Sequence, residues 1–310
     1  MTATARTRAY PDTMLVLAAL LAAVTIPISA ALRGAMLKDP PARLAVRNYR
    51  GRDIPSVGGI VILGTFLAGE ALLTLIALLK PIGLEGADIR FSAAAIPRTF
   101  LSNEHSALLI LVLGFFLLGA VDDLAGAGQA KGFRGHLGAL RRGVVTGGAL
   151  KAFGGLALGL VVGGILELSL LPALVDALVI ALTANLLNLL DLRPGRASKV
   201  FLTLWVPLAA AGLATPFLPV TVMVAAACAI WLSADLGERG MLGDSGSNLL
   251  GAVLGGGLVI LLDVPARAGI LALLVVLTLL SEVRSFTAII EGNRALRWFD
   301  DLGGMTEKED

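Results

Sequence analysis

Charged residues are scarce in this chain. Asp, Glu, Lys and Arg make up 15% of its 310 residues, whereas soluble domains carry about 25%. Because 56% of the residues are hydrophobic and the mean hydropathy is +0.86, this shortage excludes a water-soluble globule and a disordered chain. The formal net charge is only +2 and the basic residues lie in loops between apolar runs, so we expect no nucleic acid as a partner.

Cysteine is almost absent as well. The only one, Cys228, lies within an apolar run and has no second cysteine for a disulfide or a thiolate metal cluster, so we interpret it as a packing residue. Glycine, in contrast, is abundant, with 37 residues, which in a membrane protein indicates close helix packing. The spacing of Gly155, Gly159 and Gly163 predicts such a packing face, either within the chain or in a homodimer.

Long apolar runs fill most of the sequence. A membrane-spanning helix takes about 20 apolar residues. The candidate spans are 13–32, 58–79, 106–121, 145–165, 172–190, 200–213, 217–234, 246–262 and 268–283. We therefore predict an all-α, polytopic integral membrane protein with about nine transmembrane helices in one domain, residues 1–310. The tail from Ser285 is too polar to span, and its spaced apolar residues predict an amphipathic helix along the cytoplasmic interface.

The basic residues are divided unevenly between the two sets of loops. Eighteen Lys and Arg residues fall in the loops of one side and six in those of the other, while Lys151 lies inside a span. Positive charge is retained on the cytoplasmic side of a membrane. We therefore predict that the N-terminus is outside and the tail inside, which requires an odd number of spans.

Two adjacent carboxylates, Asp122 and Asp123, end the third predicted span. The two carboxylates repel each other unless a divalent cation or a phosphate-bound cation lies between them. The alternative interpretation is a solvated helix end. Arg52 and the pair Gly58-Gly59 lie where the chain enters the second span. Arginine offers bidentate contacts to phosphate and glycine permits close backbone approach, although charge retention alone also explains the arginine.

The end of the fifth predicted span carries Asn185, Asn188 and Asp191. A spacing of three places these side chains on one helical face. The stripe indicates either hydrogen bonds between helices or a polar pocket for sugar hydroxyls and a metal. A tight basic turn follows, in which Arg193 and Arg196 are suited to phosphate contact.

The eighth predicted span opens with the segment Gly243 to Ser247. Small residues at a helix N-terminus leave backbone N–H groups free for an anion, and Asp244 suits Mg²⁺, which is usually held by one or two carboxylates plus substrate phosphates. A plain helix cap explains the segment equally well. Together, the four segments place carboxylates, amides and arginines on one membrane face, as Mg²⁺-dependent phosphoryl transfer requires.

In this order the segments resemble the motifs of the polyprenyl-phosphate N-acetylhexosamine-1-phosphate transferases, which include the phospho-MurNAc-pentapeptide translocase and the GlcNAc-1-phosphate transferases. The family patterns are P-[TS]-x-G-G, an Asp pair, N-x-x-N-x-x-D and G-D-x-G-S. They are matched by Pro55 to Gly59, Asp122-Asp123, Asn185 to Asp191 and Gly243 to Ser247. The double-Asn form resembles the GlcNAc-1-phosphate branch more than the translocase.

The resemblance implies an enzyme of the bacterial cytoplasmic membrane whose active site faces the cytoplasm. A UDP-N-acetylhexosamine of GlcNAc type and undecaprenyl phosphate would give polyprenyl-diphospho-sugar and UMP, which initiates cell-envelope glycan synthesis. It implies catalytic roles for Asp122, Asp123, Asp191 and Asp244, with Asp122, Asp123 and Asp244 as ligands of Mg²⁺ or Mn²⁺. The expected substrate contacts are Asn185, Asn188, Ser245, Ser247, Arg52, Lys131, His136, Lys151, Arg193 and Arg196.

The chain also departs from the family pattern. Gly126 stands where the family often has a lysine, and Lys131 or Lys151 is the expected substitute. Because Lys151 lies inside a span, it needs a phosphate or Asp partner unless it snorkels to the interface. Pro194 replaces a second carboxylate, and the histidine-rich loop near the C-terminus is missing. Two alternatives therefore stay open: a catalytically inactive homologue, and a lipid-linked-sugar transporter, which predicts midspan charges and internal repeats.

Overall fold

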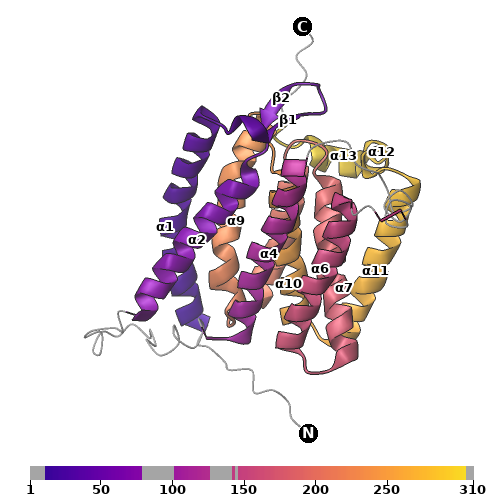
Figure 1. Ribbon diagram of the computed structural model, residues 1–310. Helices are drawn as coiled ribbons and strands as arrows, with labels where there is room; N and C mark the ends of the chain where they lie inside the picture. The colour runs from indigo at the N-terminus through magenta and orange to yellow at the C-terminus, as the bar shows by residue number, and fades with distance from the viewer. Residues whose placement is uncertain (1–10, 79–100, 126–141, 144–145, 305–310) are drawn as a thin grey trace.

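The computed structural model describes residues 11–78, 101–125, 142–143 and 146–304, and this part of the chain is helical apart from one small hairpin. The long helices are α1 (Pro11–Lys38), α2 (Gly58–Leu78), α4 (Asn103–Ala125), α6 (Gly147–Leu166), α7 (Leu170–Leu190), α8 (Arg196–Ala211), α9 (Phe217–Leu236), α10 (Gly243–Leu261) and α11 (Val264–Val283). They run alternately up and down in one bundle (Figure 1). The predicted all-α polytopic fold is confirmed.

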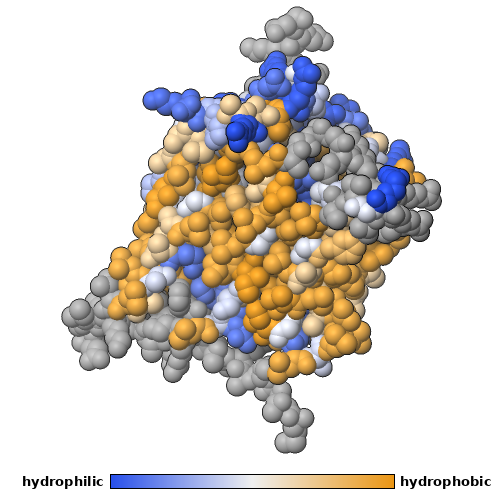
Figure 2. All heavy atoms as spheres, in the orientation of Figure 1, coloured by the Kyte–Doolittle hydropathy of each residue, from blue (hydrophilic) through white to orange (hydrophobic). Residues whose placement is uncertain are grey.

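Eight of the described helices are long and apolar enough to cross a membrane, so the chain is a multi-pass membrane protein. Hydrophobic side chains cover the middle of the bundle, and polar ones gather toward its ends (Figure 2). The predicted span 200–213 corresponds to α8, which has 16 residues and is about 24 Å long, shorter than the hydrocarbon core of about 30 Å. The expected nine full-length spans are therefore eight, plus one shorter helix, in the part of the chain described.

Helix α10 forms the centre of the bundle. It packs against α4, α7, α8 and α2, and nearly all of its residues are buried. Helix α11, in contrast, packs mainly on α7 and is the most exposed of the candidate spans. The segment Gly243 to Ser247 forms the first turns of α10. At the buried start of the central helix, this segment lies close to the ends of four neighbouring helices, α2, α4, α6 and α7.

The glycine face of α6 packs inside the chain. A Cβ atom on Gly159 would lie 2.7 Å from the Cα atom of Ala177, and one on Gly163 would lie 2.7 Å from the carbonyl oxygen of Ala173. Any larger residue would therefore push α6 away from α7. The spacing correctly indicated a packing face, and its partner is α7 rather than a second copy of the chain.

Short elements cover the end of the bundle at which α1 and α11 finish (Figure 1). After the 3-10 turn Ala42–Leu44, strands β1 (Ala45–Arg47) and β2 (Asp53–Pro55) pair as an antiparallel hairpin. The tail forms two helices, α12 (Phe286–Glu291) and α13 (Arg294–Asp301), instead of the single helix expected. The break arises because the Asn293 side chain caps α13 by accepting hydrogen bonds from two backbone N–H groups.

Candidate active site

The two adjacent aspartates at the end of α4 face different groups. The Asp123 carboxylate accepts hydrogen bonds from the backbone N–H groups of Asp244 and Ser245, each at 2.9 Å. These N–H groups belong to the second and third residues of α10, and Leu242, at the N-cap position, supplies no side-chain cap. A carboxylate at a helix N-terminus is favourable because it satisfies free N–H groups and meets the positive end of the helix dipole. Asp123 therefore caps α10 from a neighbouring helix.

Glycines let the neighbouring helix ends reach the start of α10. A Cβ atom on Gly119 of α4 would lie 2.2 Å from the carbonyl oxygen of Asp244, and one on Gly59 of α2 would lie 2.4 Å from Ser245 Oγ. The backbone N–H groups of Gly58 and Gly59 also donate to carbonyl oxygens just before α10. The glycine pair that the sequence singled out thus serves helix packing in this structure.

Lys151 joins the other aspartate of the pair to α10. Its Nζ atom lies 2.6 Å from Asp122 Oδ2 and 2.6 Å from Asp244 Oδ2. The three side chains come from α6, α4 and α10, and they are 19%, 24% and 34% exposed, respectively. The sequence predicted a phosphate or Asp partner for Lys151, and the structure shows two Asp partners: the ammonium group is ion-paired rather than extended alone toward the interface.

Asn188 of α7 extends this arrangement into the bundle. Its Nδ2 atom donates to Asp244 Oδ1 at 2.7 Å and to Ser247 Oγ at 3.1 Å. The Ser247 hydroxyl donates in turn to the carbonyl oxygen of Gly243 at 2.9 Å. We call the connected side chains Asp122, Lys151, Asn188, Asp244 and Ser247 the polar network. It draws on four helices at one end of the bundle.

The donor set of the polar network fits a divalent cation that is held jointly with a substrate. In the described residues no three His, Cys, Asp or Glu side chains converge as a complete ligand set. Mg²⁺, however, is commonly bound by one or two carboxylates plus substrate phosphates, and Asp122 and Asp244 direct oxygens at one point. Asp123 fits the expected role of metal ligand less well, because both of its oxygens accept backbone hydrogen bonds.

Asp191 follows the last residue of α7 and lines a pocket next to the polar network. The pocket is lined by Asn48, Tyr49, Ile54, Asp191, Leu192, Arg193, Pro194, Asp235, Glu238, Gly240 and Met241. Burial raises the pKa of Asp191 well above its ordinary value, and the carboxylates of Asp235, Asp244 and Asp123 raise it further. Among the described residues, none forms a hydrogen bond or an ion pair with the Asp191 carboxylate. Asp191 therefore shares one negative region with the aspartates around α10.

Four polar residues of this pocket, Asn48, Tyr49, Asp235 and Glu238, were not singled out in the sequence. Glu238 accepts hydrogen bonds from Asn48 and from the Tyr49 hydroxyl, at 3.3 and 2.9 Å, and pairs with Arg50 at 3.0 Å. Asp235 is buried and accepts a hydrogen bond from the Ser198 hydroxyl at 3.2 Å. Asp235 follows an apolar run, as Asp122 does, so the same signal could have identified it. Nothing in the sequence indicates that the Asn48-Tyr49 hairpin folds over this position.

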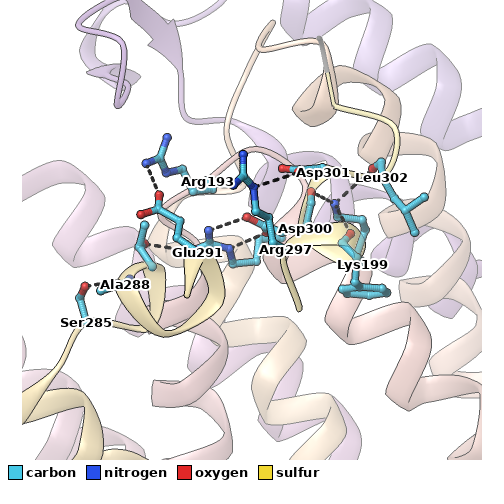
Figure 3. A network of polar contacts seen from close by, with 12 residues as sticks. Arg193, Lys199, Ser285, Ala288, Glu291, Arg297, Asp300, Asp301 and Leu302 are labelled. Carbon is cyan, nitrogen blue, oxygen red and sulfur yellow. Dashed lines mark hydrogen bonds and ion pairs between the residues drawn. The ribbon is translucent and has the colours of Figure 1, made fainter. Parts of the chain in front are cut away.

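The basic turn after Asp191 is joined to the C-terminal tail (Figure 3). Arg196 is almost fully buried, and its guanidinium forms two 2.7 Å hydrogen bonds with the two carboxylate oxygens of Asp300. Arg193 donates to Glu291 at 3.1 Å and stacks on the ring of Tyr49 at 4.5 Å. The structure therefore gives Arg196 a different partner from the phosphate that the sequence suggested, whereas Arg193 lines the pocket.

The remaining predicted contacts that the structure describes are not members of the polar network. Asn185 is exposed, and no hydrogen bond to its side chain is found in the described part of the chain. Arg52 is exposed and contributes a backbone N–H to the hairpin. Ser245 is buried against α2. Lys131 and His136 lie outside the described residues.

Comparison of the chain with models of protein families gives no match, and comparison with curated proteins gives none either. The resemblance to the sugar-1-phosphate transferases therefore rests on the four motifs. Three of them, the Asp pair, the Asn-Asn-Asp stripe and the segment at the start of α10, contribute side chains to the polar network or to the adjoining pocket. The fourth, Pro55 to Gly59, packs against the start of α10.

Proposed function

We propose that the chain transfers an N-acetylhexosamine-1-phosphate, of GlcNAc type, from a UDP-sugar to polyprenyl phosphate. In this reaction an oxygen of the lipid phosphate attacks the sugar-bearing phosphorus of the UDP-sugar. A new P–O bond forms, the bond from that phosphorus to the oxygen of the UMP moiety breaks, and UMP leaves. The products are polyprenyl-diphospho-sugar and UMP, so atoms and charge balance without a further reactant.

The polar network is the observation that supports this proposal. Two carboxylates, an ammonium group, an amide and a hydroxyl from four helices lie within hydrogen-bond distance of one another. They lie at the end of the bundle, and the two carboxylates and the ammonium group are partly exposed, so a soluble nucleotide can reach them from water and a lipid phosphate from the bilayer. Phosphoryl transfer depends mainly on positioning and on neutralising charge, which these groups are suited to do.

Each residue of the site has a separate role in the proposed transfer. Asp244 and Asp122 would hold Mg²⁺, or Mn²⁺, together with the diphosphate, and the bound ion would neutralise charge on the transferring phosphate. Asn188 fixes the orientation of the Asp244 carboxylate through a 2.7 Å hydrogen bond. Asp123 fixes the first turn of α10, on which Asp244 lies. Lys151 supplies the positive charge that the family usually places after the Asp pair.

The pocket beside Asp191 is the proposed position of the nucleotide. It lies next to the polar network and is lined by Tyr49, whose ring centre is 5.3 Å from the guanidinium of Arg50 and 4.5 Å from that of Arg193. Since α1 begins at the opposite end of the bundle (Figure 1), the proposed cytoplasmic site and an outside N-terminus are compatible. Both assignments agree with the excess of Lys and Arg in the loops at the end of the bundle that carries the site.

A transporter of lipid-linked sugar is the alternative from another class of protein. It predicts charged residues along a path through the membrane. The Glu70 carboxylate forms a hydrogen bond with the His105 ring at 2.9 Å, and the Asp176 carboxylate accepts one from Arg267 at 2.6 Å. Both pairs lie toward the end of the bundle opposite the polar network, and their charges are paired within the chain. This arrangement favours the enzyme, in which the accessible charges gather at one surface.

The proposal is tested by measuring UMP release from purified protein with Mg²⁺ and undecaprenyl phosphate. The donors are UDP-GlcNAc, UDP-GalNAc, their bacillosamine-type relatives and UDP-MurNAc-pentapeptide. Asp244→Asn removes one of the proposed metal ligands, and Asp39→Asn makes the same change at an exposed position at the end of α1. We expect UMP from one donor with wild-type and Asp39→Asn protein and none with Asp244→Asn. Equal rates in all three proteins would refute the assignment.

A further inference from the structure

Lys151 lies at the position where the two proposed metal ligands meet. Its Nζ atom is 2.6 Å from one oxygen of Asp122 and 2.6 Å from one oxygen of Asp244. Mg²⁺ binds carboxylate oxygens at about 2.0–2.1 Å. A cation that binds both of these oxygens would therefore share the space of the ammonium group, and the two positive charges would repel each other strongly at such short range.

The local structure allows the lysine side chain to leave while its surroundings stay in place. The start of α6 is fixed, because the Thr146 hydroxyl accepts a hydrogen bond from the Ala149 backbone N–H at 3.2 Å. Asp244 is also held from its other oxygen by Asn188. The lysine itself carries a flexible four-carbon stem and is 19% exposed. Only the stem needs to rotate for the ammonium group to move.

We propose that Lys151 and the divalent cation compete for Asp122 and Asp244. In the absence of substrate, the ammonium group holds the two carboxylates together and offsets their repulsion. When the metal and the diphosphate bind, the cation replaces the ammonium group, and Lys151 moves to a phosphate oxygen of the substrate. This inference rests on the proposed function and adds an order of events: metal binding is weak alone and is strengthened by the diphosphate that receives Lys151.

Mn²⁺ binding, followed by electron paramagnetic resonance without substrate, tests the competition. Lys151→Met keeps an unbranched side chain without the charged terminal atom, whereas Lys151→Arg keeps the charge. We expect Lys151→Met to bind Mn²⁺ at least about tenfold more tightly than the wild type, because a neighbouring positive charge is lost, and Lys151→Arg to bind as weakly as the wild type. The double variant Lys151→Met with Asp244→Asn should lose this increase in Mn²⁺ affinity.

The outcomes separate the competition from the metal site itself. Equal or weaker Mn²⁺ binding by Lys151→Met than by the wild type, with the binding of both lost on Asp244→Asn, refutes the competition and leaves the metal site standing. No binding by any variant at millimolar Mn²⁺ refutes both.

A second measurement uses the wild-type protein and so does not depend on the folding of a variant. An amine-acylating reagent should modify Lys151 severalfold faster in the presence of Mn²⁺, because the ion releases the lysine from its pairs, and mass spectrometry of the Lys151 peptide measures this rate. An unchanged or slower rate contradicts the competition.

Discussion

The Asp123 carboxylate and the backbone N–H of Asp244 are joined by a 2.9 Å hydrogen bond, which links the end of α4 to the start of α10. Its neighbour Asp122 faces the Lys151 ammonium group instead. The two carboxylates of the adjacent pair therefore have different tasks. One builds the helix end on which Asp244 lies, and the other belongs to the partly exposed polar network.

Substitutions in this pair should separate stability from activity. Asp123→Ala leaves two N–H groups of α10 without an acceptor, and we expect it to lower the free energy of unfolding by about 2 kcal/mol. Asp123→Asn keeps one acceptor and should recover part of that loss. Asp122→Asn should change the stability by less than about 1 kcal/mol, since its ion pair is partly exposed, yet abolish UMP release. Thermal unfolding and UMP release measure the two effects; a stable, active Asp123→Ala protein would contradict the capping role.

The raised pKa of Asp191 predicts a pH-dependent stability. Burial and nearby carboxylates raise this pKa, so the fold favours the protonated form. The contribution of Asp191 to stability is then fully present below the ordinary carboxyl pKa of about 4 and is lost as the pH rises through the raised value. Asp191→Asn cannot ionise, so its stability relative to the wild type should increase with pH.

Unfolding temperatures of the wild type and Asp191→Asn between pH 4 and 8 measure this effect. Asp39→Asn, an exposed aspartate at the same end of the bundle, serves as the matched control and should show a constant difference from the wild type. A constant difference for Asp191→Asn too would show that its surroundings do not penalise the charge. We also expect this variant to lose UMP release despite its stability, because Asp191 lines the proposed nucleotide pocket.

The attachment of the tail should depend on the buried Arg196–Asp300 pair. Removing one partner of a buried ion pair costs about 3–5 kcal/mol, so Arg196→Met should strongly destabilise the tail and expose α12 and α13 to proteolysis. Arg297–Asp301, at 3.6 Å, is a largely exposed pair in the same tail, and Arg297→Met should cost less than about 1 kcal/mol. Limited proteolysis compares the two variants; equal cleavage rates would contradict the anchoring role.

The helices of the bundle could be predicted from the sequence, but the polar contacts between them could not. Apolar runs predict membrane helices because each must hide its backbone from lipid, and every predicted span falls on a helix of the described chain. The run at 200–213 was placed too late because Arg196 and Lys199, both buried at the start of α8, look like loop residues in the sequence. Their charges are satisfied by α13, about 100 residues away, a distance that periodicity does not bridge.

In the site, too, the sequence predicted which residues take part but not where each side chain lies. The motifs supplied the aspartates and Asn188, and the cost of a charge inside a span correctly required a partner for Lys151. The sequence gives no means of deciding which member of the Asp pair caps α10, since both carboxylates are equivalent along the chain. It also gave no sign of the pocket formed by Tyr49 and Glu238, whose contact joins segments 189 residues apart.

The central claim is the transfer of a sugar together with its phosphate, and a labelled donor tests it most directly. Purified protein is given UDP-GlcNAc, or whichever donor releases UMP, with ³²P in the sugar-bearing phosphate, together with Mg²⁺ and undecaprenyl phosphate. The account predicts that the label enters the lipid fraction, with one UMP released for each labelled lipid, and that Asp244→Asn yields neither. Label that remains in water-soluble UDP while the sugar reaches the lipid, or an absence of lipid product from every donor, would contradict it.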